Sequence, residues 1–258
     1  MKILSIPNEN GKMTCFWEEG ASSGKKPLII CLADKEEDAQ RDLNLLFSQA
    51  NGASVAALVI YPQTEEQIVG DWLYSLRQRE DVDENRITLT GTLSAADWVW
   101  RLGSHFPQWF AGICAVGGYG DPYEVRAMNV PVRAYLVEEE PQIIRKGKVA
   151  VNVDQLVMSL LTAGSECVEM RSMYGKNPWN KAIQEDGAVS WLLEQNRKHQ
   201  FQVIWLKPGV WRIDDWFSSS CYLIEGQDKA LLIDTGLGEG NLAELVTSLT
   251  NLPVEVAI

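Results

Sequence analysis

Histidine and cysteine, the side chains that most often carry nucleophilic catalysis or bind transition metals, are scarce in this sequence. Its 258 residues include two histidines, His105 and His199, and five cysteines that stand singly along the chain. No two cysteines have the close spacing of a metal motif, and their odd number argues against a set of disulfides. The cysteines are therefore predicted to be reduced and mostly buried thiols, as in a cytoplasmic protein.

Long apolar runs and basic charge are lacking too. No segment reaches the roughly 18 apolar residues that a membrane span requires, and the N-terminus has no apolar stretch of the signal-peptide type. The formal net charge is -12, and the one short basic run, residues 145–148, does not change that balance. Because a negative field repels phosphates, the sequence predicts neither a nucleic-acid partner nor a membrane.

The first 198 residues do contain a regular alternation of apolar strands and amphipathic helices. Residues 27–32 (PLIICL) and 55–61 (VAALVIY) are continuous apolar runs, which are typical of strands buried on both faces. Helical spacing follows each run, over residues 36–50 and 67–80. Alternating strands and helices are joined by right-handed crossovers. The predicted fold class is therefore α/β, with a mostly parallel sheet flanked by helices.

One stretch, from Arg86 to Pro107, combines a strand, a sharp turn and a helix. Residues 86–90 alternate and are β-branched, and Gly91 then permits a tight turn. From Ala95 the apolar residues fall four apart on one helix face. This is the local structure on which a nucleophile can be presented above a sheet.

The ends of that stretch resemble a known family. Residues 83–91 (DENRITLTG) and 104–107 (SHFP) are similar to the nucleophile segment of α/β-hydrolases, in particular esterases of the polyhydroxybutyrate-depolymerase and feruloyl-esterase type. That family carries Gly-x-Ser-x-Gly at the turn. Alignment without a gap puts Leu93 in the place of the nucleophilic serine and Ser94 one residue later. The resemblance implies a degenerate site, and a one-residue slip that restores Ser94 as nucleophile is the alternative.

The other catalytic positions that the resemblance implies are altered as well. Where the family has a His-Gly pair that serves the oxyanion hole, this sequence has Ala33 and Asp34, and a carboxylate repels an oxyanion. The family's histidine falls on Lys176, and a lysine is protonated at neutral pH and cannot accept a serine proton. Glu140 is a candidate for the triad acid, although its acidic run is better interpreted as a solvated surface.

From about residue 199 the pattern changes to short strands in quick succession, followed by a helix over residues 241–249. The segments that resemble the opening of a metallo-β-lactamase-fold domain, in order, are 209–213 (GVWRI), 220–224 (SCYLI) and 230–236 (ALLIDTG). This resemblance implies that Asp234, Thr235 and Gly236 form a structural turn rather than metal ligands. The family's His-x-His-x-Asp-His run would come after residue 258. Zinc is therefore expected only in a complete domain, and no cofactor is expected in this chain.

We interpret the sequence as two domains, an α/β-hydrolase-like (pseudo-esterase) domain over residues 1–198 and an incomplete, mostly antiparallel metallo-β-lactamase-like segment over residues 199–258. The predicted function is an inert N-terminal fragment of a metallo-β-lactamase-superfamily hydrolase. Two alternatives stay open: a non-catalytic binding or scaffolding protein, and a serine esterase that uses Ser94. An incomplete second domain also predicts self-association, or pairing with a chain that completes it. The aromatic side chains expected in that contact are Trp205, Trp211, Trp216 and Phe217.

Overall fold

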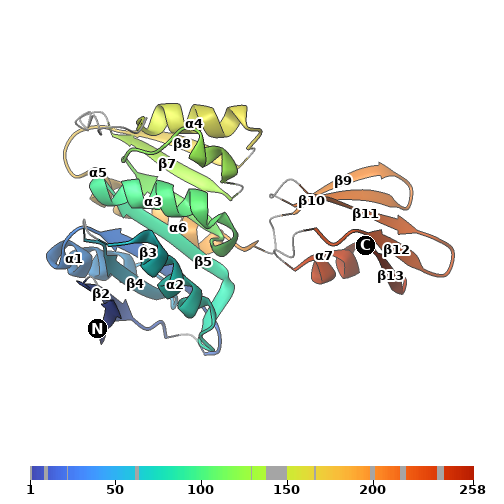
Figure 1. Cartoon of the computed structure of the whole chain (residues 1–258), viewed down its shortest axis with the longest axis horizontal. Coiled ribbons are helices and arrows are strands. Elements are labelled where there is room, and N and C mark those ends of the chain that lie inside the picture. Colours follow the sequence, from blue (N-terminus) through green and yellow to red (C-terminus); the bar gives the residue numbers. More distant parts are fainter. Residues whose placement is uncertain are drawn as a thin grey trace. The chain divides into compact units, whose positions relative to one another are not determined.

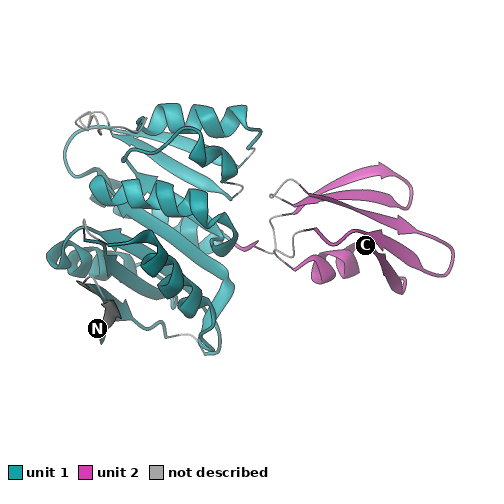
Figure 2. Cartoon of the chain, viewed as in Figure 1, with its two compact units in different colours: residues 1–195 teal, residues 196–258 magenta. Residues whose placement is uncertain are grey.

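The computed structural model describes residues 2–8, 11–21, 23–61, 64–128, 130–137, 150–165, 167–197, 201–215, 219–236 and 241–258. The chain forms two compact units, residues 1–195 and 196–258 (Figure 2). Several predicted features lie outside the described residues: the boundary at 198–200 with His199, the acidic run with Glu140, the basic run 145–148, Trp216 and Phe217.

The first unit is built on an eight-stranded sheet that is mostly parallel (Figure 1). Its strands are β1 (Lys2–Asn8), β2 (Gly11–Glu18), β3 (Lys26–Ala33), β4 (Ser54–Val59), β5 (Val82–Thr92), β6 (Gly112–Val116), β7 (Val132–Val137) and β8 (Val168–Met173). In space they run β1-β2-β4-β3-β5-β6-β7-β8. The β1–β2 hairpin joins β4 antiparallel, and the pairs from β4 to β8 are parallel. The predicted α/β class with a mostly parallel sheet is confirmed.

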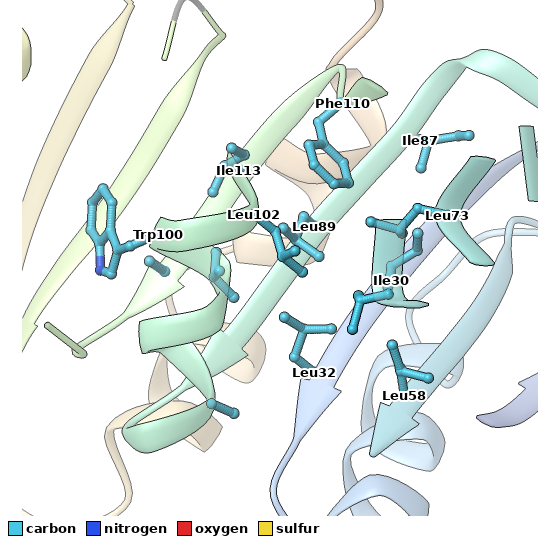
Figure 3. Packing of buried hydrophobic residues seen from close by; sticks show 14 of the residues in the cluster. Ile30, Leu32, Leu58, Leu73, Ile87, Leu89, Trp100, Leu102, Phe110 and Ile113 are labelled. Carbon is cyan, nitrogen blue, oxygen red and sulfur yellow. The ribbon is translucent and has the colours of Figure 1, made fainter. Parts of the chain in front are cut away.

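Helices cover both faces of this sheet because its central strands are apolar on both sides. The helices are α1 (Glu36–Phe47), α2 (Glu66–Arg77), α3 (Ser94–His105), α4 (Val153–Thr162), α5 (Pro178–Gln184) and α6 (Ala188–Glu194). On β3, Leu28, Ile30 and Leu32 pack with α2, α3 and α4. The alternate residues Ile29, Cys31 and Ala33 pack with α1, α5 and α6. Figure 3 shows part of the first core, where Leu102 of α3 and Leu73 of α2 lie toward the sheet.

Gly91 lets α3 fold back closely over the strand that precedes it. A Cβ atom at this position would lie 2.9 Å from Val99 Cγ2 and 3.4 Å from the backbone carbonyl of Ala95. The approach to Val99 Cγ2 is shorter than real Cβ atoms show, so a larger residue would require Val99 on α3 to shift. The predicted sharp strand–turn–helix between residues 86 and 107 is present, with β5 beginning earlier, at Val82.

The first unit ends in two short helices, α5 and α6, and α6 ends at Glu194. Asn177 and Gly187 precede them with left-handed backbones, φ 59° and φ 68°. Pro178 then begins α5, because its fixed φ suits the first helical position. Helical spacing alone does not show such breaks.

The second unit is a five-stranded sheet with one helix. Its elements are β9 (Phe201–Lys207), β10 (Val210–Asp215), β11 (Ser220–Glu225), β12 (Ala230–Ile233), α7 (Leu242–Leu249) and β13 (Val254–Ala257). Strands β9 to β12 form an antiparallel meander, and α7 carries the chain across so that β13 pairs parallel to β12. A small core under α7 contains Ile213, Leu223, Leu232 and Val246. Nowhere in the described parts of the chain is a helix long and apolar enough to cross a membrane.

Candidate functional site

Leu93 occupies the turn between β5 and α3 in a strained conformation. Its backbone has φ 51° and ψ −123°, and its N–H donates to the Val116 carbonyl at 2.9 Å. Among the described residues, the other non-glycine residues with positive φ are Asn51, Asn177 and Asp234. Asn and Asp tolerate that region, whereas a branched apolar residue is a true outlier there. Backbone strain of this kind is concentrated at functional sites, so this turn is a candidate functional site.

Ser94, the first residue of α3, lies beside the strained turn and is exposed. Its hydroxyl donates a hydrogen bond to Asp34 Oδ2. Asp34 follows directly on the buried end of β3, where Ala33 packs in the core. The structure thus brings together Ser94 and Asp34, two predicted site residues that are sixty positions apart in sequence.

The remaining predicted site residues do not join this pair. Lys176 is an exposed residue in the loop between β8 and α5. His105 ends α3, where its ring contacts the carboxylates of Glu66 and Glu124. His105 and Ser94 are eleven positions apart on the helix, or about 16 Å along its axis. His199 and Glu140 lie outside the described residues. The described part of the chain therefore places no histidine within hydrogen-bond reach of Ser94.

A pocket of about 550 Å³ opens beside the pair, on the side of the sheet where β3, β4 and β5 end. It is lined by Asp34, Lys35, Ile60, Ser94, Asp97, Trp98 and Arg101. The carboxyl ends of parallel strands are where α/β sheets bind ligands. The volume also falls within the range of small-molecule sites, about 300 to 1,000 Å³.

Four of the lining residues come from one face of α3, and their hydrogen bonds fix them in place. Asp97 is 5% exposed and accepts a hydrogen bond from the Tyr119 N–H at 2.6 Å. The Nε of Arg101 lies 2.6 Å from Glu66 Oε2, and its guanidinium lies 5.1 Å from the centre of the Trp98 ring. Sequence reasoning missed Asp97 and Arg101 because it followed the apolar face of this helix. The signal was present in the polar spacing 94, 97, 101, which also marks one face.

The cysteine thiols do not contribute to this site. Four of the five are buried, as the sequence predicted. Burial raises the pKa of Cys15 and of Cys114 to about 12, and that of Cys221 to about 11. These thiols stay protonated at neutral pH, and a thiol rather than a thiolate is a poor nucleophile.

The second unit carries the predicted Asp234 turn. Asp234 has φ 68°, and its Oδ1 accepts hydrogen bonds from the N–H groups of Thr235 (2.6 Å) and Gly236 (3.0 Å). The carboxylate is therefore engaged with its own turn. No group of three or more His, Cys, Asp or Glu side chains suited to a metal ion occurs among the residues that the structure describes.

Comparisons with known proteins identify the fold of the first unit. No described protein family and no curated protein matches the sequence. Among solved structures, a thermostable esterase matches with a TM-score of 0.61 and 18% identity, over 76% of this chain and 63% of that one. The first unit has the α/β-hydrolase fold. An α/β-hydrolase from a deep-sea metagenome, MGS-M1, matches with a TM-score of 0.53 and 12% identity, over 74% of this chain and 96% of that one.

A third α/β-hydrolase neighbour is 2,6-dihydroxy-pseudo-oxynicotine hydrolase, with a TM-score of 0.58 and 11% identity over 76% of this chain and 68% of that one. The matched share is close to the share of the first unit, which holds 195 of the 258 residues, or about 76%. The chain thus spans less than two thirds of the thermostable esterase and nearly all of MGS-M1.

These matches overturn the function predicted from the sequence. The N-terminal fragment of a metallo-β-lactamase-superfamily hydrolase is contradicted, because the matching structures are esterases and other hydrolases of the α/β-hydrolase fold. The prediction gave too much weight to short apolar segments such as residues 230–236. A meander with one crossover helix is a common arrangement, and an arrangement alone does not carry a function.

Proposed function

We propose that the first unit is a binding domain of the α/β-hydrolase fold, which holds a small polar molecule in the pocket beside α3 without acyl transfer. The conformation of Leu93 carries this proposal. The strained turn between β5 and α3 is where this fold presents its nucleophile, and here the residue with φ 51° is a leucine. An apolar side chain at that position cannot attack an ester.

The groups around Ser94 also oppose acyl transfer. Its hydroxyl is hydrogen-bonded to a carboxylate, and a carboxylate stands close to where an oxyanion would form. Two like unit charges 4 Å apart near a protein surface repel each other by about 4 kcal/mol. Because about 1.36 kcal/mol changes a rate tenfold, this repulsion would slow the reaction about a thousandfold.

The pocket itself supports binding. It combines an apolar wall, from Ile60 and Trp98, with a few fixed polar groups, and this mixture is typical of small-molecule sites. Binding at this edge of the sheet does not depend on a nucleophile, so it is compatible with Leu93. The proposal requires no metal or cofactor.

A second candidate function is ester hydrolysis through Ser94. It is favoured by the hydrogen bond to Asp34, which could accept the serine proton, and by the fold shared with esterases. In this mechanism Asp34 would act as the general base, in the place of a histidine.

The two candidates separate in one set of assays. Hydrolysis of p-nitrophenyl butyrate is measured for the wild type, for Ser94→Ala and for the control Ser248→Ala, which changes a serine on α7. The binding proposal expects the three rates to be equal. A loss of tenfold or more in Ser94→Ala, with Ser248→Ala unchanged, would instead establish the esterase.

Binding has its own test. A mixture of small polar fragments is screened against the wild type by ligand-observed NMR, and the hits are repeated with Ser94→Trp, which fills the pocket. Circular dichroism checks that this variant is folded. We expect hits that the wild type binds and Ser94→Trp does not. Hits that both proteins bind equally would place any binding outside this pocket.

For the second unit we propose a relationship of fold only. The β9–β12 meander, the crossover through α7 and the Asp234 turn support a resemblance to the opening of a metallo-β-lactamase-fold domain. We propose no metal and no hydrolytic activity for it.

A further inference from the structure

We infer that the pocket beside α3 selects a small cationic ligand, a primary amine on an apolar body, and that Asp34 receives its ammonium group. This inference rests on the binding function proposed above and adds the chemical class of the ligand.

One carboxylate oxygen of Asp34 is available to accept a hydrogen bond from a ligand. Its Oδ2 accepts the Ser94 hydroxyl, whereas within the described residues its Oδ1 has no hydrogen-bond partner. The carboxylate is partly exposed and lines the pocket. A carboxylate accepts hydrogen bonds only, and its strongest partners are cationic N–H donors. The open oxygen is therefore matched by an ammonium group.

The charge balance of the pocket also favours a cation. Asp97 adds a second carboxylate, which is buried. Of the two basic side chains in the lining, Arg101 is paired with Glu66 at 2.6 Å, so its charge is largely compensated. Lys35 is exposed to solvent. With Glu66 counted, three carboxylates and two basic groups lie at the pocket, so its charge is negative on balance, and the net charge of -12 adds to its attraction for cations.

Binding of a negative ligand at the N-terminus of α3 is disfavoured by Asp34. The N-terminus of α3 has free N–H groups and a positive dipole end, which attract negative groups. Asp34 contacts the hydroxyl of Ser94, the first residue of α3, so its negative charge already lies near this helix end. An acidic ligand would be repelled by Asp34 and Asp97, and the exposed Lys35 would offset only part of this repulsion.

The other lining residues determine which apolar part of a ligand fits the pocket. Ile60 is buried, and Trp98 is partly buried with its ring next to the Arg101 guanidinium. These side chains offer an apolar wall that suits a short alkyl chain or an aromatic ring. An arylalkylamine combines such a body with a single ammonium group.

Three probes of similar size test the charge preference. Benzylamine, benzyl alcohol and benzoate are titrated into the full chain by isothermal calorimetry at pH 7 and low ionic strength. We expect benzylamine to bind about tenfold or more tightly than benzyl alcohol, as a charged hydrogen bond provides, and benzoate not to bind. Equal binding of the three probes, tighter binding of benzoate, or no binding of benzylamine at 10 mM would overturn the inference.

Variants then locate the effect. Asp34→Asn keeps the shape and removes the charge, and it should weaken benzylamine about tenfold or more. The control Asp228→Asn removes one charge from the turn between β11 and β12 and should have no effect. Benzylamine affinity that is unchanged in Asp34→Asn would also refute the role of this carboxylate.

Failure of this inference is distinguishable from failure of the binding function. Pocket binding of benzyl alcohol or benzoate that is as tight as that of benzylamine, and that is lost in Ser94→Trp, would refute the amine preference and leave the binding function standing. Ester hydrolysis that depends on Ser94 would refute the non-catalytic function instead.

Discussion

The strain at Leu93 can be measured by comparing glycine with alanine at that position. Both substitutions remove the leucine side chain, which is 45% exposed, so both lose the same packing. They differ in the backbone, because alanine keeps the Cβ atom that makes a positive φ unfavourable and glycine does not. The difference between the two variants therefore isolates the strain.

The expected magnitude follows from two opposing contributions. A non-glycine residue in a sparsely populated backbone region costs about 1 to 3 kcal/mol. Glycine adds freedom to the unfolded chain and costs about 0.5 to 1 kcal/mol relative to alanine. Leu93→Gly should therefore be more stable than Leu93→Ala by up to about 2.5 kcal/mol, with a central value of about 1 kcal/mol, the difference of these contributions.

Met158 provides the matched control. It is 61% exposed and lies within α4, where the backbone is helical. Met158→Gly should be less stable than Met158→Ala by about 1 kcal/mol, since glycine is a poor helix former. Native-state amide hydrogen exchange of β3 gives the free energy of opening of the first unit in all four variants. If glycine were less stable than alanine at position 93 as well, the turn would not be strained.

Three further predictions concern the cores and an edge strand. Burial raises the pKa of Cys15 and of Cys114 to about 12 from 9.0, so the stability that each thiol contributes is complete below pH 9 and is lost as the pH rises toward 12. Urea unfolding at pH 7 and at pH 10 should show that the unfolding free energy falls by about 1.4 kcal/mol for each thiol over this interval. Cys114→Ala should reduce this fall. An unchanged pH dependence in that variant would contradict the assignment. Trp179→Phe removes the indole N–H that donates to the buried Asp42 Oδ1 at 3.0 Å, and the unfolding free energy should fall by about 1 to 3 kcal/mol. The control Trp205→Phe changes a side chain that is 62% exposed and should stay within about 0.5 kcal/mol of the wild type. Finally, the amides of β13 should exchange faster than those of β3, because β13 is an edge strand that pairs only with β12; equal protection would show that something covers this edge.

Periodicity in the sequence was sufficient to predict the layers of the first unit. The run at residues 27–32 is apolar at every position, and a strand with that pattern must have a core on each face. The switch to helical spacing likewise predicted the sharp turn, although the turn lies at Leu93 and Gly91 is still part of β5. These signals are local, since they depend on neighbours within a few positions.

What could not be predicted depends on residues that are far apart in the sequence. Asp34 and Ser94 meet only because β3 and β5 are neighbours in the sheet. Asp42 and Trp179, 137 positions apart, join α1 to α5 by a hydrogen bond that no pattern shows. The pocket was missed for the same reason, because its lining comes from three separate segments. The function predicted for the whole chain was wrong because a short local resemblance was extended to the whole protein.

The strand order of the first sheet has a consequence for how the chain assembles as it is synthesised. After β5, each new strand joins the edge left by its predecessor, from β6 to β7 to β8. The strand that forms this edge at each stage of synthesis is therefore covered by the next strand to be made, until β8 becomes the final edge strand. On β8, Glu169 and Arg171 carry opposite charges and contact each other. Charged side chains on an exposed edge strand discourage another chain from adding a strand. The sheet is therefore extended by the chain's own strands, and its extension beyond β8 by a second molecule is disfavoured.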